Sequence, residues 1–256
     1  MNSVIELINN ISEAVHPDHV ITFLNMLQSK SDIIITTANI NVIRNNVPTT
    51  ELLSIIEHIL SPKLIVGVSL LLSMHSDIID RSHEGSFLII CKAYLNLGNN
   101  IKGNIQYVYH FVIKIVKRMV KIVCRMNQPR CIINTLLKVI PFIQPSAYCL
   151  SPLHADILQL CIKGQMYDHA VRFIDDNPIL EIDMKACFIS GLDYLRYFYY
   201  AGICYIGMKN FKVALDYLNQ CISTPTEKLS EVIICAIKKA KLISLIDNGT
   251  EFSVSS

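Results

Sequence analysis

The sequence predicts an all-α protein, an α-solenoid of irregular helical hairpins that wind into a right-handed superhelix. Two adjacent stretches within residues 193–225 carry small or apolar residues at spacings of three and four, which places those residues on one face of a helix. A weaker copy of this pair lies within residues 154–175. One such hairpin cannot bury its apolar face alone, so the pattern implies stacked neighbouring hairpins.

The pair of helices within residues 193–225 gives the strongest of these signals. A short break at residues 208–210 separates the two helices, as in an αα-hairpin. Gly202 and Ala214 let the two backbones approach closely, and with Tyr205 they fall where a tetratricopeptide-like repeat has its small and aromatic positions, although the tetratricopeptide Trp is absent. The residues expected at the contact between the helices are Phe198, Gly202, Tyr205, Phe211, Ala214 and Leu218.

The two hairpins are not regular copies of each other. In the first hairpin, Leu158 and Cys161 take the places of the glycine and tyrosine of the second. The spacing from Ala170 to the equivalent Ala214 is 44 residues, which is longer than a regular tetratricopeptide period. We therefore expect an irregular array with connections of variable length.

Proline and capping residues mark the boundaries of the predicted helices. Ser61-Pro62 and Ser151-Pro152 each place an N-cap before a proline at the first helical position, and residues 224–227 add a capping box. Residues 33–37 have strand propensity, but we favour helix because no nearby segment could pair with a strand there. We assign residues 1–246 to one helical-repeat domain and 247–256 to a polar tail that frays. The helices are placed near 3–14, 18–30, 50–60, 62–75, 84–97, 104–126, 130–143, 152–163, 167–176, 184–207, 210–222 and 226–246.

Composition favours a soluble, intracellular protein. Hydrophobic residues make up 52% of the 256 residues, which is ample for a continuous core. The longest uncharged stretches are too short, or too rich in proline, to span a membrane, and the N-terminus lacks the basic region of a secretory signal. The chain has nine cysteines, and no two of them form a C-x-x-C motif. Cys204, Cys221 and Cys235 lie within apolar helical patterns, which favours buried thiols over metal ligands or disulfides.

Positive charge is concentrated in the middle of the chain, although the formal net charge is only +2. Residues 85–155 contain nine Lys and Arg residues and no Asp or Glu. One predicted helix there carries an apolar stripe that ends at Met126 and, beside it, a basic face. This face is either the solvated side of a packed helix, which we favour, or a docking site for an acidic protein segment. Membrane-surface or nucleic-acid binding is less favoured, since no recognised nucleic-acid motif accompanies the charge. The basic face consists of Lys114, Arg118, Lys121 and Arg125.

Two candidate motifs, one for phosphate and one for metal, lack residues that such binding requires. The glycine spacing at 98–103 matches a P-loop, but Asn104 follows where phosphate binding needs a lysine. His16 and His19 flank Pro17 and lack a convincing third ligand. We expect no cofactor and no metal.

The remaining candidate groups favour structural roles over catalysis. His154 and His169 have no evident nucleophile near them, so we expect them to pack or to cap helices. An acidic cluster lacks the order of an EF-hand and is expected at a helix end facing solvent. Its members are Asp175, Asp176, Glu181 and Asp183. The chain is therefore not expected to be an enzyme.

Two segments resemble a known protein family. The sequences PLHADILQLCIKGQMYDHAVRFID (152–175) and YLRYFYYAGICYIGMKNFKVALDYLNQCISTP (194–225) closely resemble the helical-repeat region of subunit three of the COP-nine (COP9) signalosome. The most specific matches are His154-Ala155-Asp156, the aromatic run at 197–200, and Phe211 with Ala214-Leu215. The resemblance is strong from about residue 150 to residue 246 and faint before that.

This resemblance implies a non-catalytic scaffold subunit of the complex that removes a ubiquitin-like modifier from cullins and so regulates cullin-RING ubiquitin ligases. It implies the other signalosome subunits as partners, an indirect link to cullin-RING ligases, and a location in the cytoplasm and nucleus. Family members usually continue into a winged-helix PCI module. This sequence ends before it, as a truncated product, an isoform or an incomplete gene model would. The alternative is a free helical-repeat adaptor that binds an acidic protein partner through the basic face.

Overall fold

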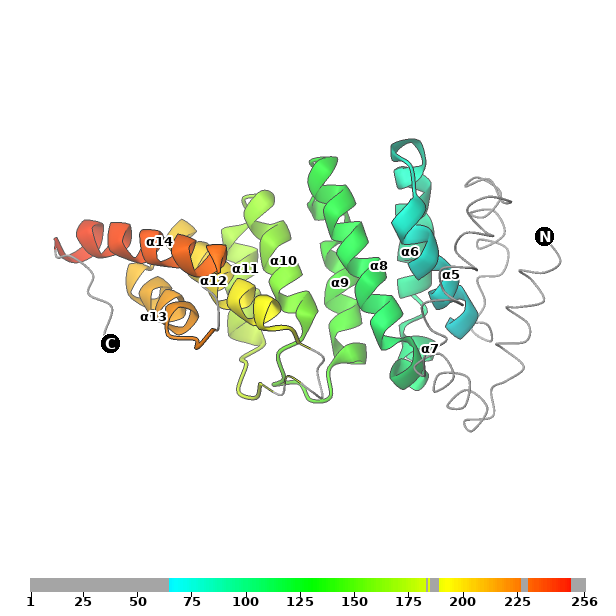
Figure 1. Cartoon of the computed structure of the whole chain (residues 1–256). Helices are drawn as coiled ribbons and strands as arrows, with labels where there is room; N and C mark the ends of the chain where they lie inside the picture. Colours follow the sequence, from blue (N-terminus) through cyan, green and yellow to red (C-terminus); the bar gives the residue numbers. More distant parts are fainter. Residues whose placement is uncertain (1–64, 183, 185–188, 227–229, 250–256) are drawn as a thin grey trace. The chain divides into compact units, whose positions relative to one another are not determined.

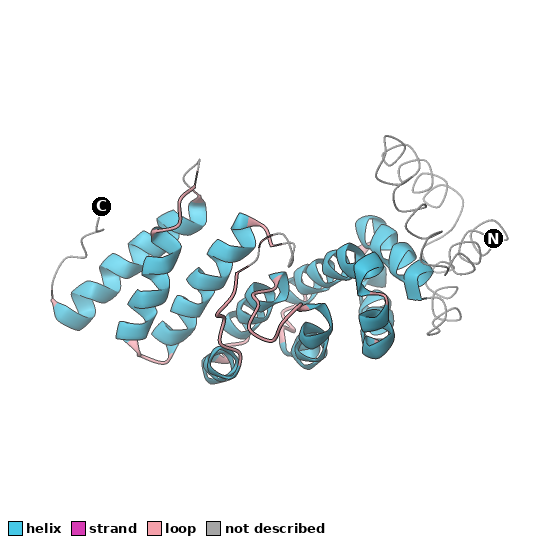
Figure 2. Cartoon of the chain, turned by 90° about the horizontal axis from the view of Figure 1, so that it is seen from below, coloured by secondary structure: helices cyan, strands magenta, loops and turns pink. Residues whose placement is uncertain are grey.

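The computed structural model describes residues 65–182, 184, 189–226 and 230–249 (Figure 1). Within these ranges the structure consists of helices joined by loops, with one isolated parallel β-bridge between Cys149 and Glu181 (Figure 2). The predicted all-α helical-repeat fold is confirmed, while the handedness of the array stays a prediction. The chain divides into two compact units, Met1–Ile122 and Val123–Ser256.

The first unit contains α5 (Ile65–Ile78), η2 (Arg81–His83), α6 (Glu84–Leu95), α7 (Gly98–Gly103) and most of α8 (Ile105–Arg125). The Ser69 Oγ on α5 lies 2.6 Å from the Tyr94 hydroxyl on α6, and both residues are buried. The apolar stripe predicted on α8 is buried except at its end, because Met126 lies beyond the helix and is 40% exposed. The buried members of the stripe are Val108, Val112, Ile115, Met119 and Ile122.

The second unit stacks helices as the sequence predicts. It contains α9 (Arg130–Ile143), α10 (Pro152–Lys163), α11 (Tyr167–Asp176), α12 (Gly191–Gly207), α13 (Phe211–Ile222) and α14 (Glu231–Asn248). The α10–α11 hairpin is followed by the α12–α13 hairpin and then by α14 (Figure 1). Helix α12 is central to this packing, since it contacts α10, α11, α13 and α14.

Side-chain caps explain where several helices begin. The Ser151 backbone N–H donates to His154 Nδ1 at 3.1 Å, and Pro152 occupies the first helical position of α10. At α12, the Asp193 N–H donates to Ser190 Oγ at 3.1 Å while the Ser190 hydroxyl donates to Asp193 Oδ2 at 2.6 Å. Each arrangement satisfies backbone groups that a helix end leaves without intrahelical partners.

Two predicted helix starts are wrong, and the caps give the reason. The helix expected from residue 184 begins at Gly191, because Ser190 and Asp193 form the cap described above. The helix expected from residue 226 begins at Glu231, where Ser230 Oγ accepts from the Val232 N–H. The expected capping residue Thr224 instead donates its hydroxyl to the Gln220 carbonyl at 2.8 Å, at the end of α13.

Three further outcomes concern short segments and the N-terminal region. Residues 98–103, to which the sequence analysis assigned no helix, form α7, whose Ile101 is fully buried. Cys235 is exposed, so its placement in the core is wrong. Several predictions lie outside the described residues. They are the helices near 3–14, 18–30 and 50–60, the alternative strand at 33–37, the possible metal ligands His16 and His19, and the helix start at Ser61-Pro62.

Candidate interaction surfaces

The two helices of the α12–α13 hairpin make their closest contact at a glycine. A Cβ added to Gly202 on α12 would lie 2.8 Å from Leu218 Cγ and 3.3 Å from the Ala214 carbonyl oxygen, both on α13. Real Cβ atoms do not approach a side-chain carbon this closely. Leu218 and Ala214 are fully buried, so the two backbones are held together at this point without a gap.

Aromatic rings extend the contact on both sides of the glycine. The ring of Tyr205 stacks on Tyr217 with centroids 5.4 Å apart and an interplanar angle of 15°. Phe198 lies 6.1 Å from the same Tyr217 ring. Phe211 is half-buried at the first position of α13. Sequence reasoning missed Tyr217, although its position three residues after Ala214 was a usable signal.

A hydrogen bond joins the two hairpins. The Tyr205 hydroxyl on α12 donates to Asp175 Oδ1 near the end of α11, at 2.7 Å. Burial and this hydrogen bond raise the pKa of Tyr205 above its ordinary value. Asp175 is exposed near the end of α11, as the sequence predicts, and the hydrogen bond gives it a structural role that the sequence did not reveal. Asp183, grouped with it there, lies outside the described residues.

A second glycine allows α12 to approach α11. A Cβ added to Gly207, the last residue of α12, would overlap the ring of Tyr167, the first residue of α11. The clash would involve Cγ and both Cδ atoms of the ring, which cannot move without a shift of the whole side chain. Two of the chain's glycines thus fix how α12 packs against its neighbours.

A cavity with aromatic walls lies between α12, α13 and the connection that precedes α12. Its volume is about 460 Å³. Among its described lining residues none is charged, which suits contact with apolar groups better than acid–base chemistry. Burial raises the pKa of Tyr197 in this wall, so its hydroxyl stays protonated. The lining residues are Ile179, Ile182, Tyr194, Tyr197, Phe198, Tyr217, Gln220, Ser223, Thr224 and Pro225.

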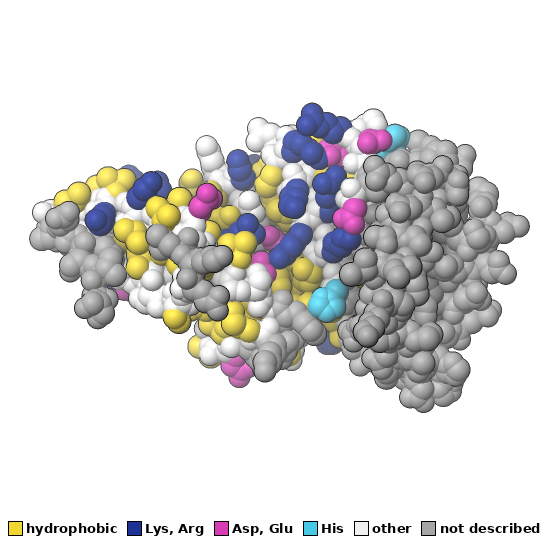
Figure 3. Space-filling view, viewed as in Figure 1, with side chains coloured by type: hydrophobic (Ala, Val, Ile, Leu, Met, Phe, Trp, Pro, Cys, Tyr) yellow, Lys and Arg dark blue, Asp and Glu magenta, His cyan; other side chains and the backbone are white. Residues whose placement is uncertain are grey.

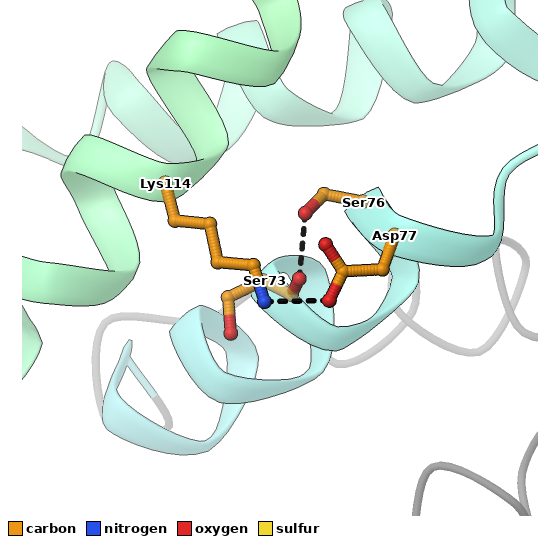
Figure 4. Close-up of polar contacts among 4 residues, drawn as sticks. All are labelled: Ser73, Ser76, Asp77 and Lys114. Carbon is orange, nitrogen blue, oxygen red and sulfur yellow. Dashed lines mark hydrogen bonds and ion pairs between the residues drawn. The ribbon is translucent and has the colours of Figure 1, made fainter.

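The predicted basic face lies along α8, where Lys and Arg side chains gather in Figure 3. Lys114 Nζ lies 2.6 Å from Asp77 Oδ2 near the end of α5, beside Ser73 and Ser76 (Figure 4). Arg118 donates from Nη2 to the Ile79 carbonyl at 3.4 Å. Lys121 is exposed on this helix, and Arg125 is its exposed last residue.

Two buried histidines have structural roles rather than roles in proton transfer. Burial lowers the pKa of both His75 and His154 to about 4, so both rings are neutral near pH 7. His154 caps α10 through Nδ1, and its ring lies 5.4 Å from that of Phe173. His169 is exposed on α11.

Two kinds of feature are absent from the described residues. These residues contain no group of three or more His, Cys, Asp or Glu placed to hold a metal ion. They also contain no helix that combines the length and the apolar character needed to cross a membrane. Five of the eight described cysteines are buried free thiols, and burial raises the pKa of Cys161 and Cys221 to about 11.

Comparison of the sequence with models of known protein families identifies the family of this chain. The model described as COP9 signalosome complex subunit 3, N-terminal helical repeats, matches residues 19–256. The chain belongs to this family. The match begins well before residue 150, in a region where the sequence analysis found only a faint resemblance.

Two curated relatives carry the same description as the family. COP9 signalosome complex subunit 3 of Arabidopsis thaliana is 31% identical over 147 residues, which is 57% of this chain and 33% of that protein. The Dictyostelium discoideum protein of the same name is 37% identical over 101 residues, or 40% of this chain and 24% of that protein. The chain thus matches about a third of the length of one COP9 signalosome relative and about a quarter of the other.

Proposed function

We propose that this chain is a non-catalytic scaffold subunit of the COP9 signalosome. The family match over residues 19–256 is the observation that carries the proposal. The structure supports a scaffold role through its stacked hairpins: the Gly202 contact closes one hairpin, and the Gly207 contact packs that hairpin against the preceding one. Helical-repeat arrays of this kind present extended surfaces to protein partners.

The proposed partners are the other signalosome subunits, and through them cullin-RING ubiquitin ligases. In this account the chain supports removal of the ubiquitin-like modifier from cullins but does not perform the hydrolysis, which belongs to a zinc-binding subunit. The uncharged aromatic cavity is in keeping with a role in protein contact. The proposed location is the cytoplasm and nucleus.

Reconstitution tests the proposal. Signalosome subunits would be combined with and without this chain, and the release of the modifier from a modified cullin would be followed over time. We expect the chain to enter the complex, to restore activity lost when the corresponding subunit is omitted, and to show no hydrolysis alone. Hydrolysis by the purified chain, or full activity of a complex that excludes it, would contradict the proposal.

A second candidate function is a free adaptor for an acidic protein. The observation that favours it is the run of residues 85–155, which holds nine cations and no acidic residue. A free adaptor would be recovered from cells with its acidic partner and without any signalosome subunit, and that composition of the complex distinguishes the two functions.

A further inference from the structure

Three cations of α8 share one side of the helix within the first unit. Lys114, Arg118 and Lys121 are separated by four and three residues, the spacings that align side chains on a helix surface. At a rise of 1.5 Å per residue the three positions span roughly 10 Å along the axis. They form a short linear array of positive charge.

Only one of these cations has a carboxylate partner in the part of the chain that the structure describes. Lys114 pairs with Asp77, and the two side chains are 44% and 49% exposed. Arg118 makes a long bond to a backbone carbonyl, and its buried Nε has no hydrogen-bond partner among the described residues. Lys121 is exposed and has no ionic partner in the same ranges. The positive charge of Lys121 is therefore uncompensated at the surface, beside the half-buried Arg118.

One end of the array already holds a carboxylate, that of Asp77. Asp77 places a carboxylate oxygen 2.6 Å from the ammonium group, at one end of the array (Figure 4). Both side chains are about half exposed, and exposed ion pairs contribute little to stability. A second carboxylate can therefore compete with Asp77 at small cost.

We propose that Lys114, Arg118 and Lys121 dock an acidic segment of a partner protein, bound in extended form. Alternate side chains of an extended chain repeat about every 6.6 Å on one side. That repeat is close to the roughly 6 Å rise between Lys114 and Arg118. The guanidinium of Arg118, half-buried and with Nη2 already donating to the Ile79 carbonyl, would add a charge-assisted hydrogen bond to a carboxylate. One carboxylate would meet Arg118, a second would meet Lys121, and a third would replace Asp77 at Lys114.

The inference does not depend on the role in the signalosome, because the purified full chain suffices to test it. The probe is a fluorescent peptide of alternating Glu and Ser, and the matched probe has Gln in place of Glu. We expect the Glu peptide to bind and the Gln peptide not to bind in fluorescence anisotropy. Binding should weaken steeply between about 50 mM and about 300 mM salt, because salt screens exposed charges.

Matched variants separate the array from net charge. Lys121→Gln and Arg118→Gln should each weaken binding of the Glu peptide roughly two- to fivefold, the range of exposed ion pairs. Lys102→Gln removes an exposed cation on α7 of the same unit and should change the affinity by less than about 1.5-fold. Asp77→Asn should tighten binding by releasing Lys114. Asp80→Asn removes an equal charge from an exposed residue outside the pair and should tighten it less.

Two results would overturn the proposal. If Lys102→Gln weakens binding as much as Lys121→Gln does, the peptide responds to the overall charge of the protein, and the array is not a specific binding site. If a single-stranded oligonucleotide of equal length binds more tightly, with the same dependence on Arg118 and Lys121, the ligand is a nucleic acid and not an acidic protein segment. Circular dichroism of each variant would verify that the helices are intact.

Discussion

Gly202 on α12 lies so close to Leu218 on α13 that only a hydrogen atom fits between them. A Cβ at Gly202 would lie 2.8 Å from Leu218 Cγ and 2.9 Å from Cδ2. Both residues are buried, and Leu218 is fully so. The hairpin's geometry therefore depends on the absence of a side chain at one position.

The first prediction follows from that contact. Gly202→Ala should lower the free energy of unfolding by about 1–3 kcal/mol, because the added methyl group overpacks the interface. The better helix propensity of alanine, worth up to about 1 kcal/mol, offsets part of the loss. Urea denaturation would measure the change.

The control for this prediction lies on the same helix. Gly191 begins α12, and a Cβ there would meet nothing within 4 Å. Gly191→Ala should therefore alter stability by less than about 0.5 kcal/mol. Equal destabilisation by the two variants would show that crowding at Leu218 is not the cause.

A second prediction concerns the approach of α12 to α11. Gly207→Ala should destabilise the second unit, because the new methyl group overlaps the ring of Tyr167. We expect a loss of about 1–2 kcal/mol for overpacking at this exposed position, where the half-buried Tyr167 ring must shift. Combining the change with Tyr167→Ala should give a smaller total loss than the sum of the two single changes, since neighbours are not additive. Strict additivity in the double-mutant cycle would contradict the contact.

The third prediction isolates the hydrogen bond from Tyr205 to Asp175. Tyr205→Phe removes the hydroxyl but keeps the ring that stacks on Tyr217. The loss should be about 1 kcal/mol, because Asp175 is exposed and water replaces part of the interaction. Asp175→Asn should cost less in the Phe variant than in the original chain. An unchanged cost would indicate that the two groups do not interact in solution.

The fourth prediction is a pH dependence from His154. Its folded-state pKa is about 4, below the ordinary 6.5, because the ring is buried. The unfolded chain then binds more protons between these values, so stability is full above about pH 6.5 and falls as the pH drops toward 4. At about 1.4 kcal/mol per pKa unit, His154 alone accounts for a loss of up to about 3 kcal/mol.

His154→Gln provides the comparison. A glutamine at this position can still accept the capping hydrogen bond but does not titrate. Denaturation from pH 7 to pH 4 should show a shallower loss for the variant, with the remainder due in part to His75, whose pKa burial lowers in the same way. Parallel stability curves for the two proteins would refute a buried neutral His154.

The sequence could predict contacts made within one hairpin. Gly202 and Leu218 are 16 residues apart and joined by a short turn, so helical spacing alone brings them to the same interface. The contacts of Gly207 with Tyr167 and of Tyr205 with Asp175 depend on how one hairpin stacks on the next. No local sequence pattern predicts how one hairpin aligns with the next, which is why these contacts appear only in the structure.

The same limit applies to helix starts and to the basic face. Ser151 could be identified as a cap because Pro152 follows it, whereas Ser190 lies within a stretch whose apolar residues appeared to continue the helix. Helical spacing placed Lys114, Arg118 and Lys121 on one side of α8. It could not identify Asp77, which is 37 residues from Lys114 in the chain and meets it only through the packing of α5.

Assembly into the signalosome is the central claim, and quantitative co-purification tests it most directly. The chain would be tagged at its natural abundance, purified from its own cells, and the signalosome subunits that accompany it would be counted by mass spectrometry. We predict that they co-purify in amounts equal to the chain, and that Gly191→Ala leaves this unchanged. A folded chain that purifies without any of them would contradict the account.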